Sequence, residues 1–412
     1  MVYSHRLGLP PRAGNLGTQQ TFKIIVSSNG APLVGALVFL VTTANDTGNQ
    51  HVRSTIANNA GAASIAFSVN QETPLYVSAV AESGTWYGAS KCFKTPILLE
   101  CPPLKFSGPI EWWHRNVGIN EYNPHRGAGI KVGLVDSGIG PHPYLKHVED
   151  LGAIIGGKHQ ANGEDVSYHG TMMAGLIAAR PTSSRHPAGI SPGASLSSIR
   201  VYPGGADGAN PDDVAAAIEF LALKAGADLI NLSLSSAQKC DRQEQAIDRA
   251  RSAGTLCIAA AGNESQPPVR YPAALSQVVA VGASGFDATG PVPETNAVFR
   301  PENADKIGTG DVYLSTISGF GKKLLCLAPG TAIASTVPSK SGQPLYASQV
   351  GSSDSVAIIT GVLAASLADD KAYLKLDRDA GRADYAEQRL RDLCRSIELK
   401  QVYQGLGIPA LP

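Results

Sequence analysis

Apolar and polar residues alternate in two different ways along the chain, and the change comes near residue 110. Between residues 20 and 100, short runs rich in β-branched and aromatic residues, such as TFKIIVSS and LYVSAVAES, are separated by Gly- and Asn-containing turns, such as NGAP and NDTGNQ. Strands at this spacing, with no helical period between them, are typical of a β-sandwich. We therefore predict a small all-β domain of the immunoglobulin-like sandwich type over residues 20–100, after an N-terminal tail of residues 1–19.

After residue 110, apolar strands alternate with helices. The segments IKVGLVD, DLINLSLSS, TLCIAAAGN and VVAVGAS have the pattern of buried strands, whereas GTMMAGLIAA, DDVAAAIEFLALKAGA and CDRQEQAIDRARSAG have the pattern of helices. This alternation predicts an α/β domain over residues 111–412, with a parallel sheet and helices on both of its faces. The stretch ILLECPPLKFSGP has the prolines of a linker, which we place at residues 101–110.

Composition excludes several classes of partner. Lys and Arg together number 34, as do Asp and Glu, so the chain has no net charge to attract nucleic acid or an anionic membrane. No apolar run reaches the roughly 18 residues that a membrane span needs. The segment MVYSHRLGLPPRAGN has no apolar stretch of signal-peptide length. We therefore expect a cytoplasmic protein without a membrane span or a nucleic-acid partner, and export by a non-standard route stays open.

The six cysteines are scattered and form no C-x-x-C pair. In a chain of this length, such a distribution is typical of free, mostly buried thiols in a reducing compartment. A bridge between Cys92 and Cys101 stays open, because these two are close in sequence. The cysteines are Cys92, Cys101, Cys240, Cys257, Cys326 and Cys394.

Three polar residues lie next to strand ends and helix starts, where functional groups are usually found in an α/β fold. Asp136 ends the strand IKVGLV, His169 begins the helix HGTMMAGLIAA, and Ser353 precedes the helix VAIITGVLAA. Each has an ordinary explanation on its own, because Asp-Ser-Gly is a common turn and serine is a common helix cap. Their order along the chain, Asp then His then Ser, is the order of the subtilisin-type catalytic triad.

Five segments in the same order resemble the motifs of the subtilisin-like serine peptidases, or subtilases. KVGLVDSGI resembles the aspartate motif of that family and HGTMMAGLIAA its histidine motif. GADLINLSLSS is similar to the strand that pairs with substrate, and IAAAGNES, followed by RYPAALSQVVAVGA, to the region of the oxyanion asparagine. LAPGTAIASTVP precedes the serine motif in QVGSSDSV, as in the family. The resemblance covers about residues 110–365 and, more faintly, YQGLGIPAL, and it leaves out the predicted sandwich.

The resemblance implies a serine endopeptidase that forms an acyl-enzyme on Ser353. His169 would be the general base, Asp136 would orient it, and Asn263 and the backbone N–H of Ser353 would stabilise the oxyanion. The expected substrate is a peptide or protein, and no organic cofactor is implied. Calcium is frequent in the family, but no metal site can be located in this sequence. The residues implied to bind substrate are Ser233, Leu234, Ser235, Ala261 and Gly262.

The chain departs from the family pattern around the nucleophile. DSVAIIT replaces the usual Met-Ala-x-Pro-His, which puts the carboxylate of Asp354 beside Ser353. Met172 stands where a second histidine is common, and Ser235 and Ser236 replace glycines. These departures leave two alternatives open. One is an inactive peptidase fold that binds peptides, with the sandwich as its adaptor, and the other is a transpeptidase or specialised peptide-processing enzyme.

Two interpretations of Asp354 also stay open. Either it lies at the mouth of the active site and raises the pKa of His169, or it points into solvent and complements the helix dipole.

Three further features have simpler interpretations. Residues 285–324 have the composition of an insertion, which we expect to be a surface excursion. Trp112 and Trp113 are expected to pack before the first strand of the α/β domain. The cluster of His142, His147, Glu149 and Asp150 lacks the spacing of a metal site.

Overall fold

Two sheets packed face to face form the N-terminal part of the computed structural model, which describes residues 18–46, 50–204, 208–287 and 297–412. In one sheet β8 and β5 pair with β1, and β2 pairs with the end of β1. The other sheet has the order β4-β3-β6-β7. The strands are β1 (Gln19–Ser28), β2 (Ala31–Pro32), β3 (Leu37–Ala44), β4 (Gln50–Ile56), β5 (Ala62–Ser68), β6 (Glu72–Val80), β7 (Gly88–Ser90) and β8 (Ile97–Glu100). This is the predicted sandwich.

One strand of the sandwich was missed by the sequence prediction. ILLE forms β8, which runs parallel to β1 with Ile97 opposite Ile24, and it lies inside the predicted sandwich of residues 20–100 although its own sequence was not recognised as a strand. Its alternate residues Ile97 and Leu99 are buried in the sandwich core. The prolines that suggested a linker begin only after the strand, at Pro102.

The apolar run of β3 is continuous because both faces of this strand are buried. Val38 and Leu40 point into the sandwich core, and Phe39 and Val41 point the other way into a second apolar cluster. That cluster includes Phe299, Ile317 and Val350 of the α/β domain together with Tyr76 and Tyr87 of the sandwich. The sandwich is therefore packed against the α/β domain through a shared apolar interface.

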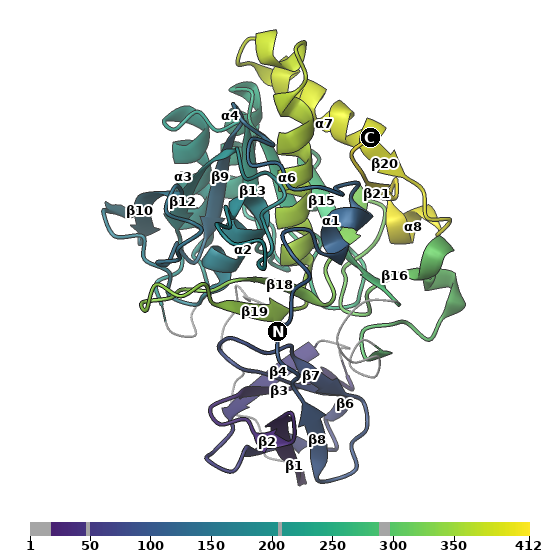
Figure 1. Cartoon of the computed structure of the whole chain (residues 1–412). Helices are drawn as coiled ribbons and strands as arrows, with labels where there is room; N and C mark the ends of the chain where they lie inside the picture. The colour runs from purple at the N-terminus through teal and green to yellow at the C-terminus, as the bar shows by residue number, and fades with distance from the viewer. Residues whose placement is uncertain (1–17, 47–49, 205–207, 288–296) are drawn as a thin grey trace.

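Hydrogen bonds join the two parts at the same place. The Tyr87 N–H donates to the Ser348 hydroxyl at 2.7 Å, and the Tyr87 hydroxyl accepts from the Ala332 N–H at 3.2 Å. Ser348 lies in β19 (Tyr346–Gln349), which forms a hairpin with β18 (Ile333–Thr336). Figure 1 shows this hairpin between the sandwich and the α/β domain.

A single large sheet forms the centre of the α/β domain. Its order is β11-β10-β12-β9-β13-β14-β15-β16, with β17 also paired to β15. The pairs among β9, β10, β12, β13, β14, β15 and β17 are parallel, and β11 and β16 join antiparallel. The strands are β9 (Lys131–Asp136), β10 (Glu149–Ile155), β11 (Lys158–Gln160), β12 (Ser195–Arg200), β13 (Leu229–Leu232), β14 (Leu256–Ala260), β15 (Val278–Phe286), β16 (Val312–Leu314) and β17 (Cys326–Pro329).

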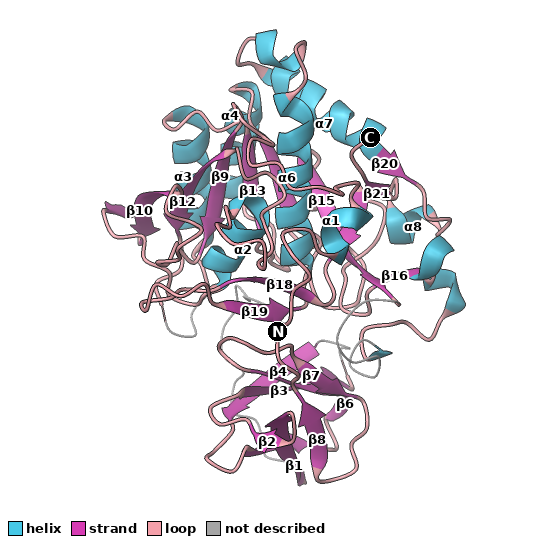
Figure 2. Ribbon diagram, in the orientation of Figure 1, coloured by secondary structure: helices cyan, strands magenta, loops and turns pink. Residues whose placement is uncertain are grey.

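Helices cover both faces of this sheet, as predicted (Figure 2). α6 (Ser352–Ala368) lies against β13, β14, β15 and β17 and is flanked by α2 (His169–Ala178), whereas α3 (Pro211–Leu223) and α4 (Asp241–Ser252) pack together on the sheet. α6 is buried on all sides from Ser352 to Leu367, which explains its apolar sequence. No helix in the described part of the chain is long and apolar enough to cross a bilayer.

The remaining elements complete the domain without entering the sheet. α1 (Trp112–Asn116) buries Trp113, and the indole N–H of Trp112 donates to the Ala332 carbonyl, so this pair packs against the domain. The C-terminal elements are α7 (Ala380–Leu393), β20 (Cys394–Arg395), α8 (Gln401–Gln404) and β21 (Ile408–Pro409), and the 3₁₀ helices are η1 (Ala304–Lys306), η2 (Thr309–Asp311) and η3 (Tyr373–Lys375).

Two open points of the sequence analysis are answered by the fold. All six cysteines are free, so Cys92 and Cys101 form no bridge. The stretch 285–324 is not only a surface excursion, because β16 within it is buried and pairs with β15. Residues 288–296 of that stretch lie outside the described part of the chain.

Candidate active site

Asp136 and His169 form a buried hydrogen-bonded pair at the carboxyl end of the parallel sheet. β9 ends at Asp136, whose Oδ1 is 2.7 Å from Nδ1 of His169, the first residue of α2. Both side chains are almost fully buried. The N–H of Ser137 also donates to Asp136 Oδ1, at 2.7 Å. The carboxylate is therefore held in place and can fix the tautomer of the imidazole.

The turn that carries His169 is organised by Asp165, which the sequence analysis overlooked. Its carboxylate accepts hydrogen bonds from the hydroxyl of Ser137 and from the N–H groups of Tyr168 and Thr171, at 2.8 to 2.9 Å. Tyr168 has a left-handed backbone, with φ of 70°. An aspartate that bonds the backbone a few residues ahead is a usual turn signal, and this signal was present in DVSYHGT.

The electrostatic surroundings favour the charged form of His169. Burial alone would lower its pKa, but the charge of Asp136 and its hydrogen bond, together with the charges of Asp354 and Asp165, raise the pKa of His169 above its usual value. The neutral imidazole, which can act as a base, is therefore reached only at a higher pH than for a free histidine.

Ser353 lies at the start of α6, next to the strand that neighbours β9. Its hydroxyl donates to the Ser233 carbonyl at 3.2 Å, and the Ser233 hydroxyl donates to the Ser353 carbonyl at 3.1 Å. The hydroxyls of the other two serines of the segment donate to groups in the protein interior. Ser352 Oγ donates to Asn263 Oδ1, and Ser355 Oγ donates to the Ala328 carbonyl. These bonds give both a structural role, so Ser353 is the candidate nucleophile of the three.

The side chain of Asn263 is oriented by the first residue of α6. Its Oδ1 accepts from both the N–H and the hydroxyl of Ser352, each at 2.8 Å. This leaves Nδ2 as the end that faces away from Ser352. A methyl group built on Gly351 would lie 3.5 Å from that Nδ2 and 3.7 Å from the backbone nitrogen of Ser353. Two N–H donors, as an oxyanion site requires, thus border one small space beside Gly351, and Asp354 Oδ2 borders the same space at 3.9 Å.

Asp354 does not point into solvent, so the helix-dipole interpretation of this residue was wrong. Its side chain is fully buried, and Gln349 donates a hydrogen bond to its Oδ1. Within the described residues, its Oδ2 has no hydrogen-bond partner. Burial raises the pKa of Asp354 to about 7, against the effects of Gln349 and of nearby His169. The carboxyl and the imidazole therefore affect each other's ionisation.

The residues expected to bind substrate differ in their burial and in their hydrogen bonds. Ser233 and Leu234 are buried directly after β13, and Ser235 is half-buried. Gly262 adopts φ of 105°, and its carbonyl accepts from the Ser352 hydroxyl. Ala261 is fully buried, and its N–H donates to the Val281 carbonyl. Both backbone groups of Ala261 are thus bonded within the domain, since its carbonyl accepts from the Arg270 N–H, and its contact with substrate stays a prediction.

Metal ligands do not gather in this region. The described residues include no group of three His, Cys, Asp or Glu side chains that could hold a metal ion, and this covers the cluster from His142 to Asp150. His142 is buried, which lowers its pKa to about 4.

The site combines a buried aspartate–histidine pair with a serine that begins a helix, and both lie at the carboxyl edge of a parallel sheet. This is the arrangement of a serine hydrolase. Comparison with known proteins gives the family. The model of the subtilase family (Peptidase S8) matches residues 127–383, more than half of the chain, and the chain belongs to this family. It is accordingly a subtilisin-like serine protease, as the sequence motifs predicted.

Individual relatives agree with this assignment. Subtilisin BL from Lederbergia lenta is 32% identical over 243 residues, which cover 58% of this chain and 76% of that protein. Subtilisin DY from Bacillus licheniformis is 30% identical over 233 residues, covering 55% and 74% respectively. Among solved structures, sphericase matches with a TM-score of 0.61 and 22% identity, over 75% of this chain and all of that one. This last likeness concerns the fold.

Proposed function

We propose that the protein is an endopeptidase that hydrolyses peptide bonds through an acyl-enzyme on Ser353. The observation that carries this proposal is the 2.7 Å hydrogen bond between Asp136 and His169, buried at the edge of the sheet where Ser353 begins α6. A serine hydroxyl is a weak nucleophile until an oriented imidazole accepts its proton, and this pair supplies such an imidazole.

The proposed reaction assigns one task to each residue. His169 takes the proton of the Ser353 hydroxyl as its oxygen attacks the substrate carbonyl. The oxyanion that forms is stabilised by Asn263 Nδ2 and the N–H of Ser353, which border the space beside Gly351. His169 then gives its proton to the leaving amine, and Asp136 stays ionised throughout. A water molecule, activated by the same imidazole, releases the acyl group.

Product analysis on defined peptides tests this proposal. The full chain is incubated with a mixture of unstructured peptides, and the masses of the products are measured by mass spectrometry. Hydrolysis adds one water per cut, whereas ligation gives products longer than any substrate. We expect internal cuts with water added, abolished in Ser353→Ala and retained in Ser355→Ala. Intact peptides with the wild-type protein would favour a binding protein, and ligated products would favour a transpeptidase.

A further inference from the structure

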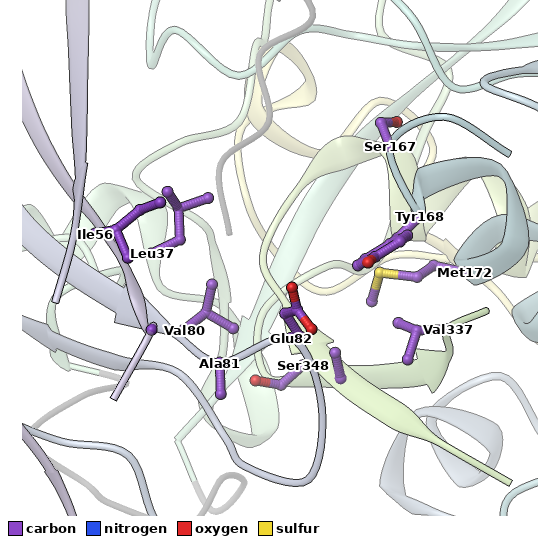
Figure 3. Close-up of a pocket in the computed structure, with 12 residues that line it drawn as sticks. Leu37, Ile56, Val80, Ala81, Glu82, Ser167, Tyr168, Met172, Val337 and Ser348 are labelled. Atoms are coloured by element: carbon purple, nitrogen blue, oxygen red, sulfur yellow. The ribbon is translucent and has the colours of Figure 1, made fainter. Parts of the chain in front are cut away.

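An apolar cavity of about 190 Å³ lies between the sandwich and the α/β domain. Figure 3 shows its two walls facing each other. The sandwich contributes the ends of β3, β4 and β6, and the α/β domain contributes the start of α2 and the β18–β19 hairpin. The apolar lining comes chiefly from Leu37, Ile56, Val80, Tyr168, Met172 and Val337, and the exposed carboxylate of Glu82 lies between the two walls (Figure 3).

The cavity adjoins the proposed active site through residues that are neighbours along the chain. Tyr168 directly precedes His169, and Ser348 in the cavity wall precedes Gln349, which bonds Asp354 beside the nucleophile. The proposed acyl side of the site lies elsewhere, along Ser233 and the strand β13.

This placement indicates which part of a substrate would reach the cavity. The leaving amine takes its proton from the imidazole, so the segment after the cut bond departs on the side of His169. Tyr168 and Met172, which flank His169 at the start of α2, line the cavity and so place it next to that imidazole.

The lining indicates the chemistry of the occupant. Ile56 is 65% exposed and Tyr168 40% exposed, although both are large and apolar. Such side chains gathered around one hollow are typical of a binding site. Met172 adds a flexible thioether that adapts to different shapes. With a volume of about 190 Å³, the cavity has room for a side chain of leucine or phenylalanine size.

We propose that this cavity binds one large apolar side chain of the substrate on the leaving-group side of the cut bond. The sandwich is then part of the specificity site and not only an adaptor. This proposal rests on the proposed function, because it assigns the cavity to the same substrate.

A kinetic experiment with two kinds of substrate tests the site. Internally quenched peptides share one acyl segment and carry Leu, Phe, Ser or Asp at the first leaving-side positions. A short methyl ester with the same acyl segment carries only a methoxy group beyond the cut bond and cannot fill the cavity. For the wild-type enzyme, we expect kcat/KM for the Leu and Phe peptides to exceed that for Ser and Asp by about 10- to 100-fold.

Variants of the sandwich then locate the preference. Ile56→Ser removes an apolar wall at a largely exposed position, and Ala81→Leu fills the half-buried floor of the cavity. Both should reduce the preference about 3- to 10-fold and leave kcat/KM for the methyl ester unchanged. Leu98→Ser, on a residue of β8 that is 71% exposed and outside the cavity, is the matched control and should behave as wild type.

The outcomes separate this proposal from the proposed function. An active enzyme whose leaving-side preference is the same in Ile56→Ser, Ala81→Leu and wild type would overturn the cavity assignment. So would variants that alter hydrolysis of the methyl ester and the peptides equally. A wild-type protein that cleaves neither substrate would refute the proposed function. In that case, binding of the amine-side peptides to the full chain is measured by calorimetry, and equal affinity for Leu and Ser peptides would refute the cavity as well.

Discussion

Asn263 allows a direct test of the proposed oxyanion site, because the two ends of its side chain have different tasks. Oδ1 accepts from the N–H and hydroxyl of Ser352, and Nδ2 borders the space beside Gly351. Asn263→Ala removes both ends. Asn263→Asp keeps an acceptor for Ser352 and replaces the donor with a carboxylate oxygen.

The magnitude follows from the loss of one of two donors. A preorganised oxyanion donor contributes about 3 to 4 kcal/mol, and each factor of ten in rate corresponds to about 1.4 kcal/mol. Both variants of Asn263 should therefore lower kcat by roughly 10²- to 10³-fold. KM should change little, because the bond forms chiefly in the transition state.

Stability should distinguish the two variants. Asn263→Ala leaves the buried N–H of Ser352 without its acceptor, which costs about 1 to 3 kcal/mol of unfolding free energy. The Ser352 hydroxyl still has the Gly262 carbonyl at 3.2 Å. Asn263→Asp keeps the acceptor and should stay closer to wild type.

Steady-state kinetics on a p-nitroanilide, together with urea unfolding of each variant, measures both effects. Ser352→Ala is the control, because it removes the hydroxyl bonds to Asn263 and Gly262 but keeps the N–H bond that orients Asn263, so kcat should stay within a few-fold of wild type. The reasoning is refuted if Asn263→Asp has a near wild-type kcat, or if Ser352→Ala is as damaging as Asn263→Ala. Either result would mean that the asparagine only shapes the turn before α6.

Three further predictions concern the same region and the sandwich. Gly351→Ala puts a methyl group between the two donors without backbone strain, since φ is 174°. We expect kcat to fall about 10-fold at an unchanged melting temperature, and an unchanged kcat would contradict the proposed position of the oxyanion. Asp354→Asn removes a carboxyl that favours imidazolium at His169 in its ionised form, which forms around pH 7, so the acidic limb of kcat/KM should move to lower pH. An unmoved limb would show that the two groups are not coupled. N-terminal sequencing of the mature protein should find the sandwich attached, because one face of the sandwich is buried against the α/β domain. A mature chain that begins near residue 105 would show instead that the sandwich is a removable pro-segment.

Much of the α/β domain could be predicted because its signals are local. Buried parallel strands require continuous apolar runs, so VVAVGAS and TLCIAAA were recognised directly. Asp136 and His169 were placed together because chemistry at a parallel sheet concentrates at the carboxyl ends of strands, and the structure joins them by a hydrogen bond. Their catalytic roles remain a prediction.

The features that were missed depend on contacts between distant segments. The burial of Asp354 could not be predicted, because it results from the packing of α6, β19 and the sandwich around it. The strand β8 ends next to prolines, and only its pairing with β1, some 70 residues earlier, identifies it as a strand. The apolar cavity likewise lies where the two domains meet, so the sequence pattern of either domain alone could not predict it.

Mapping of a fluorophosphonate adduct tests the central claim most directly. The full chain is labelled, digested and sequenced by tandem mass spectrometry across the segment that contains Ser352, Ser353 and Ser355. We predict one adduct, on Ser353, which is absent in Ser353→Ala and retained in Ser352→Ala and Ser355→Ala. Labelling that survives in Ser353→Ala, or an adduct located on another residue, would contradict the assignment of Ser353 as the nucleophile.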